Sequence, residues 1–109
     1  MNREIIKVAV DRPLGSRHPE FDMIYPVNYG FVNGIIAGDG EEQDCYILGV
    51  DEPLSEFEGR LIAIIHRLND NEDKWVVVPE NMSFSEDEIR NMIHFQEKYF
   101  EYEIEMINH

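Results

Sequence analysis

Two apolar runs stand close together in the second half of the chain: LIAIIH at residues 61–66 and WVVV at residues 75–78. Both runs are short and rich in β-branched residues, which is typical of strands rather than helices. The intervening residues 69–73 are Asn, Asp and Glu, and Asn and Asp favour turns. The sequence therefore predicts two strands joined by an acidic loop.

Three further stretches have strand character: IIKVAV at residues 5–10, GFVNGII at residues 30–36 and CYILGV at residues 45–50. The segments between the predicted strands carry Gly, Pro, Asn and Asp, which mark turns. No helix-length segment separates these strands, and parallel crossovers usually need one. We therefore predict a mainly antiparallel sheet.

The end of the chain has a different pattern. Ser85 and Glu88 have the spacing of a capping box, which marks the start of a helix. Apolar residues then recur at helical spacing at positions 89, 92, 93, 99 and 100. This pattern predicts a helix over residues 85–103 that packs against the sheet. Five strands and one terminal helix favour a small, partly open barrel, and residues 1–109 are treated as a single domain.

The charge balance excludes several classes of partner. Among 109 residues there are 23 acidic and 9 basic side chains, which gives a formal net charge of −14. Such a surface repels nucleic-acid phosphates and anionic lipids. No apolar stretch approaches the roughly 20 residues that a membrane helix needs, and Cys45 is the single cysteine. The expectation is a cytoplasmic protein without nucleic-acid or membrane partners.

An acidic stretch, DGEEQD at residues 39–44, places four carboxylates within six residues between two predicted strands. If Asp44 starts a strand and Asp39 lies in the preceding turn, their side chains can converge at the mouth of a sheet. Hard cations such as Mg²⁺ prefer these oxygen ligands and leave coordination positions for a substrate phosphate. The alternative is an ordinary Asp-Gly hairpin turn with solvated charges.

A second acidic stretch, NDNEDK, occupies residues 69–74. It too could be a solvated hairpin loop. Two carboxylate clusters meeting at one end of a small barrel would bind more than one divalent ion, which suits displacement at phosphorus. Close carboxylates repel each other by about 4 kcal/mol per pair near a protein surface, so their meeting predicts a bound cation.

A polyanionic substrate would also need fixed basic and hydrogen-bonding groups on so acidic a protein. The candidate cations follow or flank predicted strands: Arg12, Arg17, Arg67 and Lys74. Each could equally be an ordinary surface cation. Tyr25, Tyr29 and Tyr99 could donate phenolic hydrogen bonds to phosphate oxygens, or they could be core or rim aromatics.

Four blocks of sequence, taken in order, resemble the soluble inorganic pyrophosphatases of the Mg²⁺-dependent first type: YPVNYG at residues 25–30, DGEEQD at 39–44, DKWVVVP at 73–79 and HFQEKY at 94–99. The similarity runs from about residue 8 to residue 103. Residues 39–45 match the acidic signature of that family at five of seven positions and depart from it at Glu41 and Gln43.

The resemblance implies an OB-like five-stranded antiparallel barrel with a C-terminal α-helix. It implies hydrolysis of inorganic diphosphate, or of a related phosphoanhydride, to phosphate. The implied cofactor is Mg²⁺, with Mn²⁺ as a substitute, and family analogy suggests a homo-oligomer.

The resemblance also implies roles for the acidic residues. Asp39 and Asp44 would be metal ligands, with Asp44 bridging two ions, and Asp70 would hold a metal brought in with the substrate. A third ligand stands two residues before a lysine in the family. This spacing points to Glu72 before Lys74, and a shift of one residue would make the ligand Asp73.

The implied catalytic residues are Glu41, Asp44 and Arg12. Glu41 occupies the position of the aspartate that helps to deprotonate the attacking water. The residues implied as substrate contacts are Arg12, Tyr25, Tyr29, Lys74 and Tyr99.

Two departures support a rival hypothesis. Phe100 stands where the family has a lysine, and Glu41 replaces an aspartate. The rival is a catalytically degenerate module that binds a divalent metal or a phosphorylated ligand without hydrolysing it. A third hypothesis is an acidic barrel that binds only protein partners.

Overall fold

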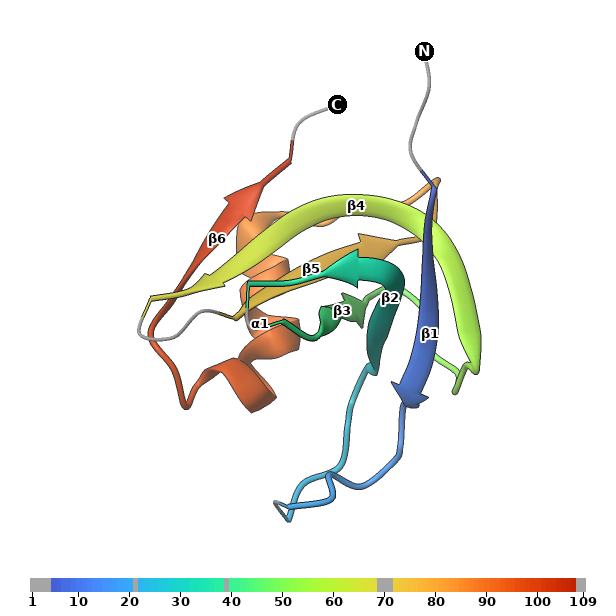
Figure 1. Cartoon of the computed structure of the whole chain (residues 1–109), viewed down its shortest axis with the longest axis horizontal. Helices are drawn as coiled ribbons and strands as arrows, with labels where there is room; N and C mark the ends of the chain where they lie inside the picture. Colours follow the sequence, from blue (N-terminus) through green and yellow to red (C-terminus); the bar gives the residue numbers. More distant parts are fainter. Residues whose placement is uncertain (1–4, 21, 39, 69–71, 108–109) are drawn as a thin grey trace.

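The computed structural model describes residues 5–20, 22–38, 40–68 and 72–107. The described elements follow the order β1 (Ile6–Arg12), β2 (Asn28–Ile36), β3 (Glu42–Ile47), β4 (Glu56–Arg67), β5 (Asp73–Val78), α1 (Glu86–Glu97) and β6 (Tyr102–Met106). Figure 1 shows the strands curving around one another, with α1 lying beside them. All five strands predicted from the apolar runs are present, with boundaries moved by a few residues.

Five of the strands close into a barrel in the order β1-β2-β3-β5-β4, and β1 pairs with β4 to complete the ring. The predicted OB-like barrel with a C-terminal helix is thereby confirmed. One neighbouring pair, β3 with β5, is parallel, so the sheet is not antiparallel throughout. The reason is geometric: directions cannot alternate all the way around a ring of five strands. The connection between these parallel strands is β4 itself, which is why no crossover helix is needed.

Strand β4 makes the closure possible because it is long enough to pair on both sides. Residues 56–59 pair with β1, whereas residues 60–66 pair with β5. Figure 1 shows β4 arching over the molecule between these two partners. Its second half also pairs with β6, which lies outside the ring.

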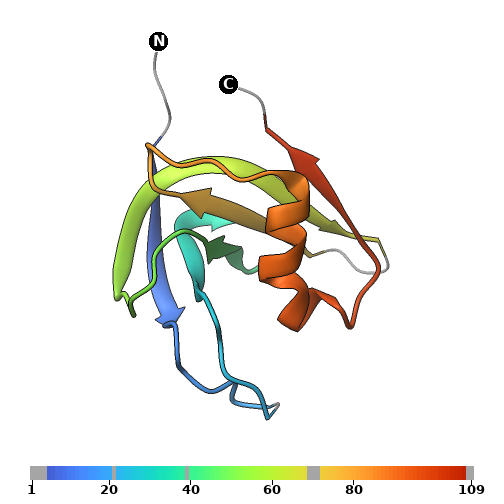
Figure 2. The same ribbon diagram turned by 180° about the vertical axis from the view of Figure 1, so that it is seen from behind.

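The side-chain alternation of β3 and β5 creates two apolar cores. Cys45, Ile47 and Val77 pack together with residues of β1 and β2. Tyr46 and Val76 point to the opposite face, where they pack in a cluster with Ile89 and Ile93 of α1. Figure 2 shows the helix in front of this face. Both strands are therefore buried on both sides, which explains their nearly continuous apolar sequence.

The helix begins as predicted but ends earlier. Both hydrogen bonds of the Ser85–Glu88 capping box are present. Helix α1 ends at Glu97, so the prediction of a helix to residue 103 is wrong. Beyond it, Tyr102, Ile104 and Met106 alternate with exposed glutamates, which is the period of a half-buried strand. These residues form β6 against β4 rather than another helical turn.

Candidate active site

A cavity of about 460 Å³ lies beside the end of α1, the end of β1 and the starts of β3 and β5. One part of its lining is polar and consists of Asp11, Arg12, Asp44, Arg67, Lys74 and Gln96. The other part is aromatic or apolar, apart from one histidine, and consists of His18, Met23, Tyr25, Tyr29, Tyr99 and Phe100. All of the predicted substrate contacts therefore line one cavity, together with one predicted metal ligand.

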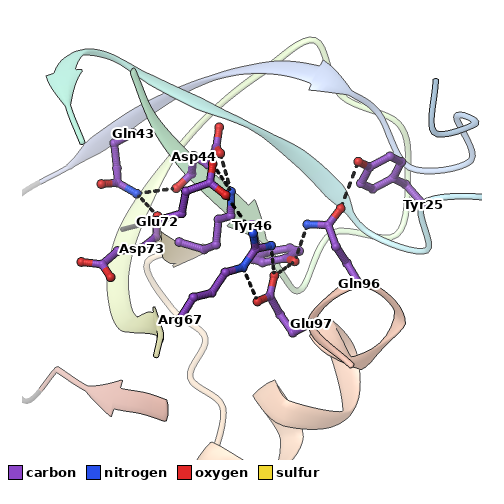
Figure 3. Close-up of polar contacts among 10 residues, drawn as sticks. Tyr25, Gln43, Asp44, Tyr46, Arg67, Glu72, Asp73, Gln96 and Glu97 are labelled. Carbon is purple, nitrogen blue, oxygen red and sulfur yellow. Dashed lines mark hydrogen bonds and ion pairs between the residues drawn. The ribbon is translucent and has the colours of Figure 1, made fainter. Parts of the chain in front are cut away.

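The parallel pairing of β3 and β5 brings the last residues of the two acidic stretches, Asp44 and Lys74, together. Tyr46 is the register partner of Val76. Asp44 and Lys74 each lie two residues earlier on their strands, so their side chains share the face of that pair. The ammonium of Lys74 lies 2.5 Å from Oδ2 of Asp44 and 3.6 Å from Oε1 of Glu72. Two carboxylates that are distant along the chain thus face the buried ammonium of Lys74, and Figure 3 shows Asp44 and Glu72 close to each other.

The remaining predicted acidic residues are placed differently. Asp73 contacts Nδ1 of His66 at 3.1 Å, and Figure 3 shows its carboxylate directed away from Asp44. The carbonyl oxygen of Asp73 accepts a 2.6 Å hydrogen bond from Gln43, which ties β5 to β3 at the edge of the site. Glu41 lies just before β3 with an exposed side chain, and its catalytic role stays a prediction. The predicted ligands Asp39 and Asp70 lie outside the described residues.

Within the described residues, no three Asp, Glu, His or Cys side chains gather closely enough to hold a metal ion. Asp44 and Glu72 nevertheless offer oxygen ligands on one side of Lys74, and each side chain is about one-third exposed, at 34% and 33%. This is the donor chemistry that Mg²⁺ prefers. The pair is therefore suited to hold a divalent cation together with further oxygen ligands.

Arg12 reaches the cavity from the end of β1. Its guanidinium interacts with the phenol of Tyr25 and lies 3.9 Å from the Asp11 carboxylate. Burial raises the pKa of Asp11, an effect partly offset by Arg12. The loop after β1 is held by the buried side chain of Asn28, whose Oδ1 accepts a 2.9 Å hydrogen bond from the backbone of Leu14.

The cavity tyrosines differ in exposure. Tyr25 and Tyr29 are buried, at 2% and 9% exposed, whereas Tyr99 is 64% exposed at the rim. Burial is the largest cause of a raised pKa at both Tyr25 and Tyr29, and the negative charge of Asp44 raises the pKa of Tyr29 further. Both phenols therefore keep their protons at neutral pH and can donate hydrogen bonds.

A series of hydrogen-bonded side chains runs from the cavity wall into the interior of the protein, and the sequence analysis did not predict it. The Tyr25 hydroxyl donates to Gln96, Gln96 donates to the Tyr46 hydroxyl, and Tyr46 donates to Glu97. Glu97 also receives two hydrogen bonds from Arg67. Figure 3 shows this series running from Tyr25 to Arg67. Its only local signal is the presence of Gln96 and Glu97 next to each other on a helix whose other buried residues are apolar.

Comparison with known proteins identifies the family. The family model of the inorganic pyrophosphatases matches residues 1–108. This chain belongs to the inorganic pyrophosphatase family. A curated inorganic pyrophosphatase from Saccharolobus solfataricus is 37% identical over 112 residues, which cover 88% of this chain and 62% of the relative. The chain thus spans less than two-thirds of that relative's length.

Solved structures of the pyrophosphatase family have the same fold. The inorganic pyrophosphatase from Ehrlichia chaffeensis superposes with a TM-score of 0.73 at 20% identity, covering 94% of this chain and 86% of the other. An inorganic pyrophosphatase from Neisseria gonorrhoeae has a TM-score of 0.60 at 26% identity, covering 81% and 69%. In the described part of this pyrophosphatase-family chain, α1 is too short and too polar to cross a membrane.

Proposed function

We propose that this protein hydrolyses inorganic diphosphate, or a closely related phosphoanhydride, to phosphate with the help of Mg²⁺, and that Mn²⁺ can replace Mg²⁺. The observation that carries this proposal is the convergence of Asp44 and Glu72 on Lys74, beside a cavity that is lined by Asp44, Lys74 and Arg12. Membership of the inorganic pyrophosphatase family supports the same reaction. A cytoplasmic location and a homo-oligomeric state remain predictions.

The chain's own cations and phenols would bind the substrate. Arg12 and Lys74 offer positive charge to the phosphate groups on a protein whose net charge is −14. Tyr25 and Tyr29 stay protonated because burial raises the pKa of each. To donate to a phosphate oxygen, each hydroxyl would exchange its present acceptor, which is Gln96 for Tyr25 and Asp44 for Tyr29. Tyr99 would close the rim of the cavity over the substrate.

Asp44 and Glu72 are the described residues that would hold the cation, and Asp39 and Asp70 are the predicted further ligands. We choose Glu72 over Asp73 because Glu72 faces Lys74, whereas Asp73 is bonded to His66. Bound Mg²⁺ supplies a water of lowered pKa and charge neutralisation for the leaving phosphate. In the proposed step the water oxygen bonds to one phosphorus, the bridging P–O bond breaks, and Glu41 receives the proton.

The first experiment measures phosphate release from diphosphate with Mg²⁺, with Mn²⁺ and with a chelator. We expect turnover with either metal and none with the chelator. Asp44→Asn should reduce turnover by at least about 100-fold, the scale seen when one group that stabilises transition-state charge is removed. The variant should keep its circular dichroism spectrum. Asp51→Asn, which changes an exposed aspartate after β3, is the matched control and should keep wild-type turnover.

The rival function is a binding module without catalysis, and Phe100 favours it because its ring lies where the family resemblance places a lysine. A thermal-shift titration with Mg²⁺ and a non-hydrolysable diphosphate analogue separates the two functions. Stabilisation by the analogue without phosphate release from diphosphate would favour the module. Absence of both effects would contradict both functions and leave the protein-binding hypothesis.

A further inference from the structure

The guanidinium of Arg67 contacts three other side chains, those of Glu97, Glu72 and Phe100. Its Nε and Nη2 donate hydrogen bonds of 2.9 and 2.8 Å to the two carboxylate oxygens of Glu97. Its Nη1 donates a 2.9 Å hydrogen bond to Oε2 of Glu72. The centre of the guanidinium lies 3.7 Å above the ring of Phe100. The Arg67 side chain is only 5% exposed, so these contacts determine where its charge lies.

The anchor of this arrangement is Glu97. Its side chain is fully buried at the end of α1 and accepts a further 2.6 Å hydrogen bond from the hydroxyl of Tyr46. Burial alone would lower the pKa of Arg67, but the hydrogen bonds and charge of Glu97 outweigh it and raise the pKa. A bidentate Arg–carboxylate pair has a fixed planar geometry. The third donor of Arg67 is therefore held in one direction, towards Glu72.

Glu72 is in turn held between two cations. Its Oε2 faces Arg67, and its Oε1 lies 3.6 Å from the ammonium of Lys74. A partly exposed glutamate just before β5 would otherwise have several rotamers available. The contacts with Arg67 and Lys74 leave the carboxylate beside Asp44, which is the arrangement that a shared cation requires (Figure 3).

We infer that Arg67 is a positioning residue: anchored by Glu97 at the end of α1 and by Phe100 just beyond it, Arg67 holds Glu72 in the place from which Glu72 binds the divalent cation. The inference rests on the proposed function. It also explains what Phe100 does in place of a lysine. The ring of Phe100 stacks against the guanidinium of Arg67. The positive charge beside the end of the helix is therefore that of Arg67 of β4, and not that of a lysine at position 100.

The experiment measures Mn²⁺ affinity by electron paramagnetic resonance, alongside the melting temperature and phosphate release. Arg67→Lys keeps a positive charge against Glu97, but its ammonium lacks the planar guanidinium fork that pairs with both oxygens of Glu97 while directing a third N–H at Glu72. Loss of a group that orients a metal ligand typically weakens metal affinity by about 10- to 100-fold, and we expect a loss of that size. Arg90→Lys is the matched control because Arg90 also pairs with a glutamate and lies over an aromatic ring, and it does not line the cavity. It should keep wild-type Mn²⁺ affinity.

A double-mutant cycle distinguishes positioning from a general structural effect. Glu72→Gln should weaken Mn²⁺ binding, and adding Arg67→Lys to it should cause no further loss, because the group that Arg67 positions is already gone. Additive losses in the double variant, or wild-type Mn²⁺ affinity in Arg67→Lys, would overturn the inference while leaving the proposed function intact. A wild-type protein that neither binds Mn²⁺ nor releases phosphate would instead contradict the proposed function and this inference together.

Discussion

Glu97 connects the end of α1 to Arg67 and Tyr46 through buried hydrogen bonds. It is 0% exposed, and its charge is balanced by two hydrogen bonds from Arg67 and one from Tyr46. Removing one partner of a buried ion pair leaves the other charge buried and uncompensated. Stability should therefore respond to this side chain much more strongly than to the surface carboxylates.

The corresponding prediction compares two Glu–Arg pairs. Glu97→Gln should lower the free energy of unfolding by about 3 kcal/mol, the scale for breaking a buried pair. Glu86→Gln breaks the exposed pair with Arg90 on the same helix and should cost less than about 0.5 kcal/mol. Urea denaturation of the two variants measures the difference. Equal effects would mean that the pair of Arg67 with Glu97 contributes no more than a surface ion pair.

At the scale of elements, His66 joins three neighbouring strands. From β4, its Nδ1 lies 3.1 Å from Asp73 of β5 and its Nε2 lies 2.7 Å from Glu105 of β6. The hydrogen bond with Glu105 is the largest cause of a raised pKa at His66, and Asp73 adds to it against the opposing effect of partial burial. Through these two contacts the imidazole links β6 to the outside of the barrel, and protonation of the ring would strengthen both of them.

This arrangement predicts the direction of a pH effect. Because the pKa of His66 is higher in the folded than in the unfolded chain, protonated His66 adds to the free energy of unfolding. This contribution is fully present below about pH 6.5, the pKa of an unperturbed histidine. The contribution is lost as the pH rises through the raised pKa that His66 has in the folded chain. The melting temperature of wild type should therefore exceed that of Glu105→Gln most at low pH, and the difference should shrink as the pH rises. A difference that is constant or grows with pH would contradict the prediction.

At the scale of the whole molecule, the net charge of −14 opposes compaction and the approach of anions. Sodium chloride screens these charges in general, whereas the proposed cation between Asp44 and Glu72 would stabilise only the folded state. Linkage gives about 2.7 kcal/mol of stabilisation when free Mg²⁺ is about 100 times its Kd.

The prediction is a larger rise in melting temperature with Mg²⁺ than with NaCl at matched ionic strength. Asp44→Asn should abolish the excess, because it removes a ligand and leaves the remaining surface charge nearly unchanged. Differential scanning calorimetry of both proteins measures the effect. Equal shifts with the two salts would show that Mg²⁺ acts only by screening.

The sequence by itself determined the local features of this protein. The five β-rich runs, the capping box at Ser85 and the candidate contacts Arg12, Lys74 and Tyr29 could all be read from patterns a few residues long. Such patterns suffice because strand alternation and helix capping depend on neighbours along the chain. The same alternation in residues 102–106 also predicts β6, but the helical spacing of the residues before it obscured that signal.

Only the tertiary structure decided which of these residues meet. Asp44 and Lys74 are 30 positions apart, as are Arg67 and Glu97, and each pair forms because the closed barrel places their elements side by side. The parallel pairing of β3 with β5 follows from closing an odd number of strands, which is a property of the ring and of no single segment. The preference for Glu72 over Asp73 likewise depends on which side chain contacts Lys74 and which contacts His66 once β4 and β5 are paired.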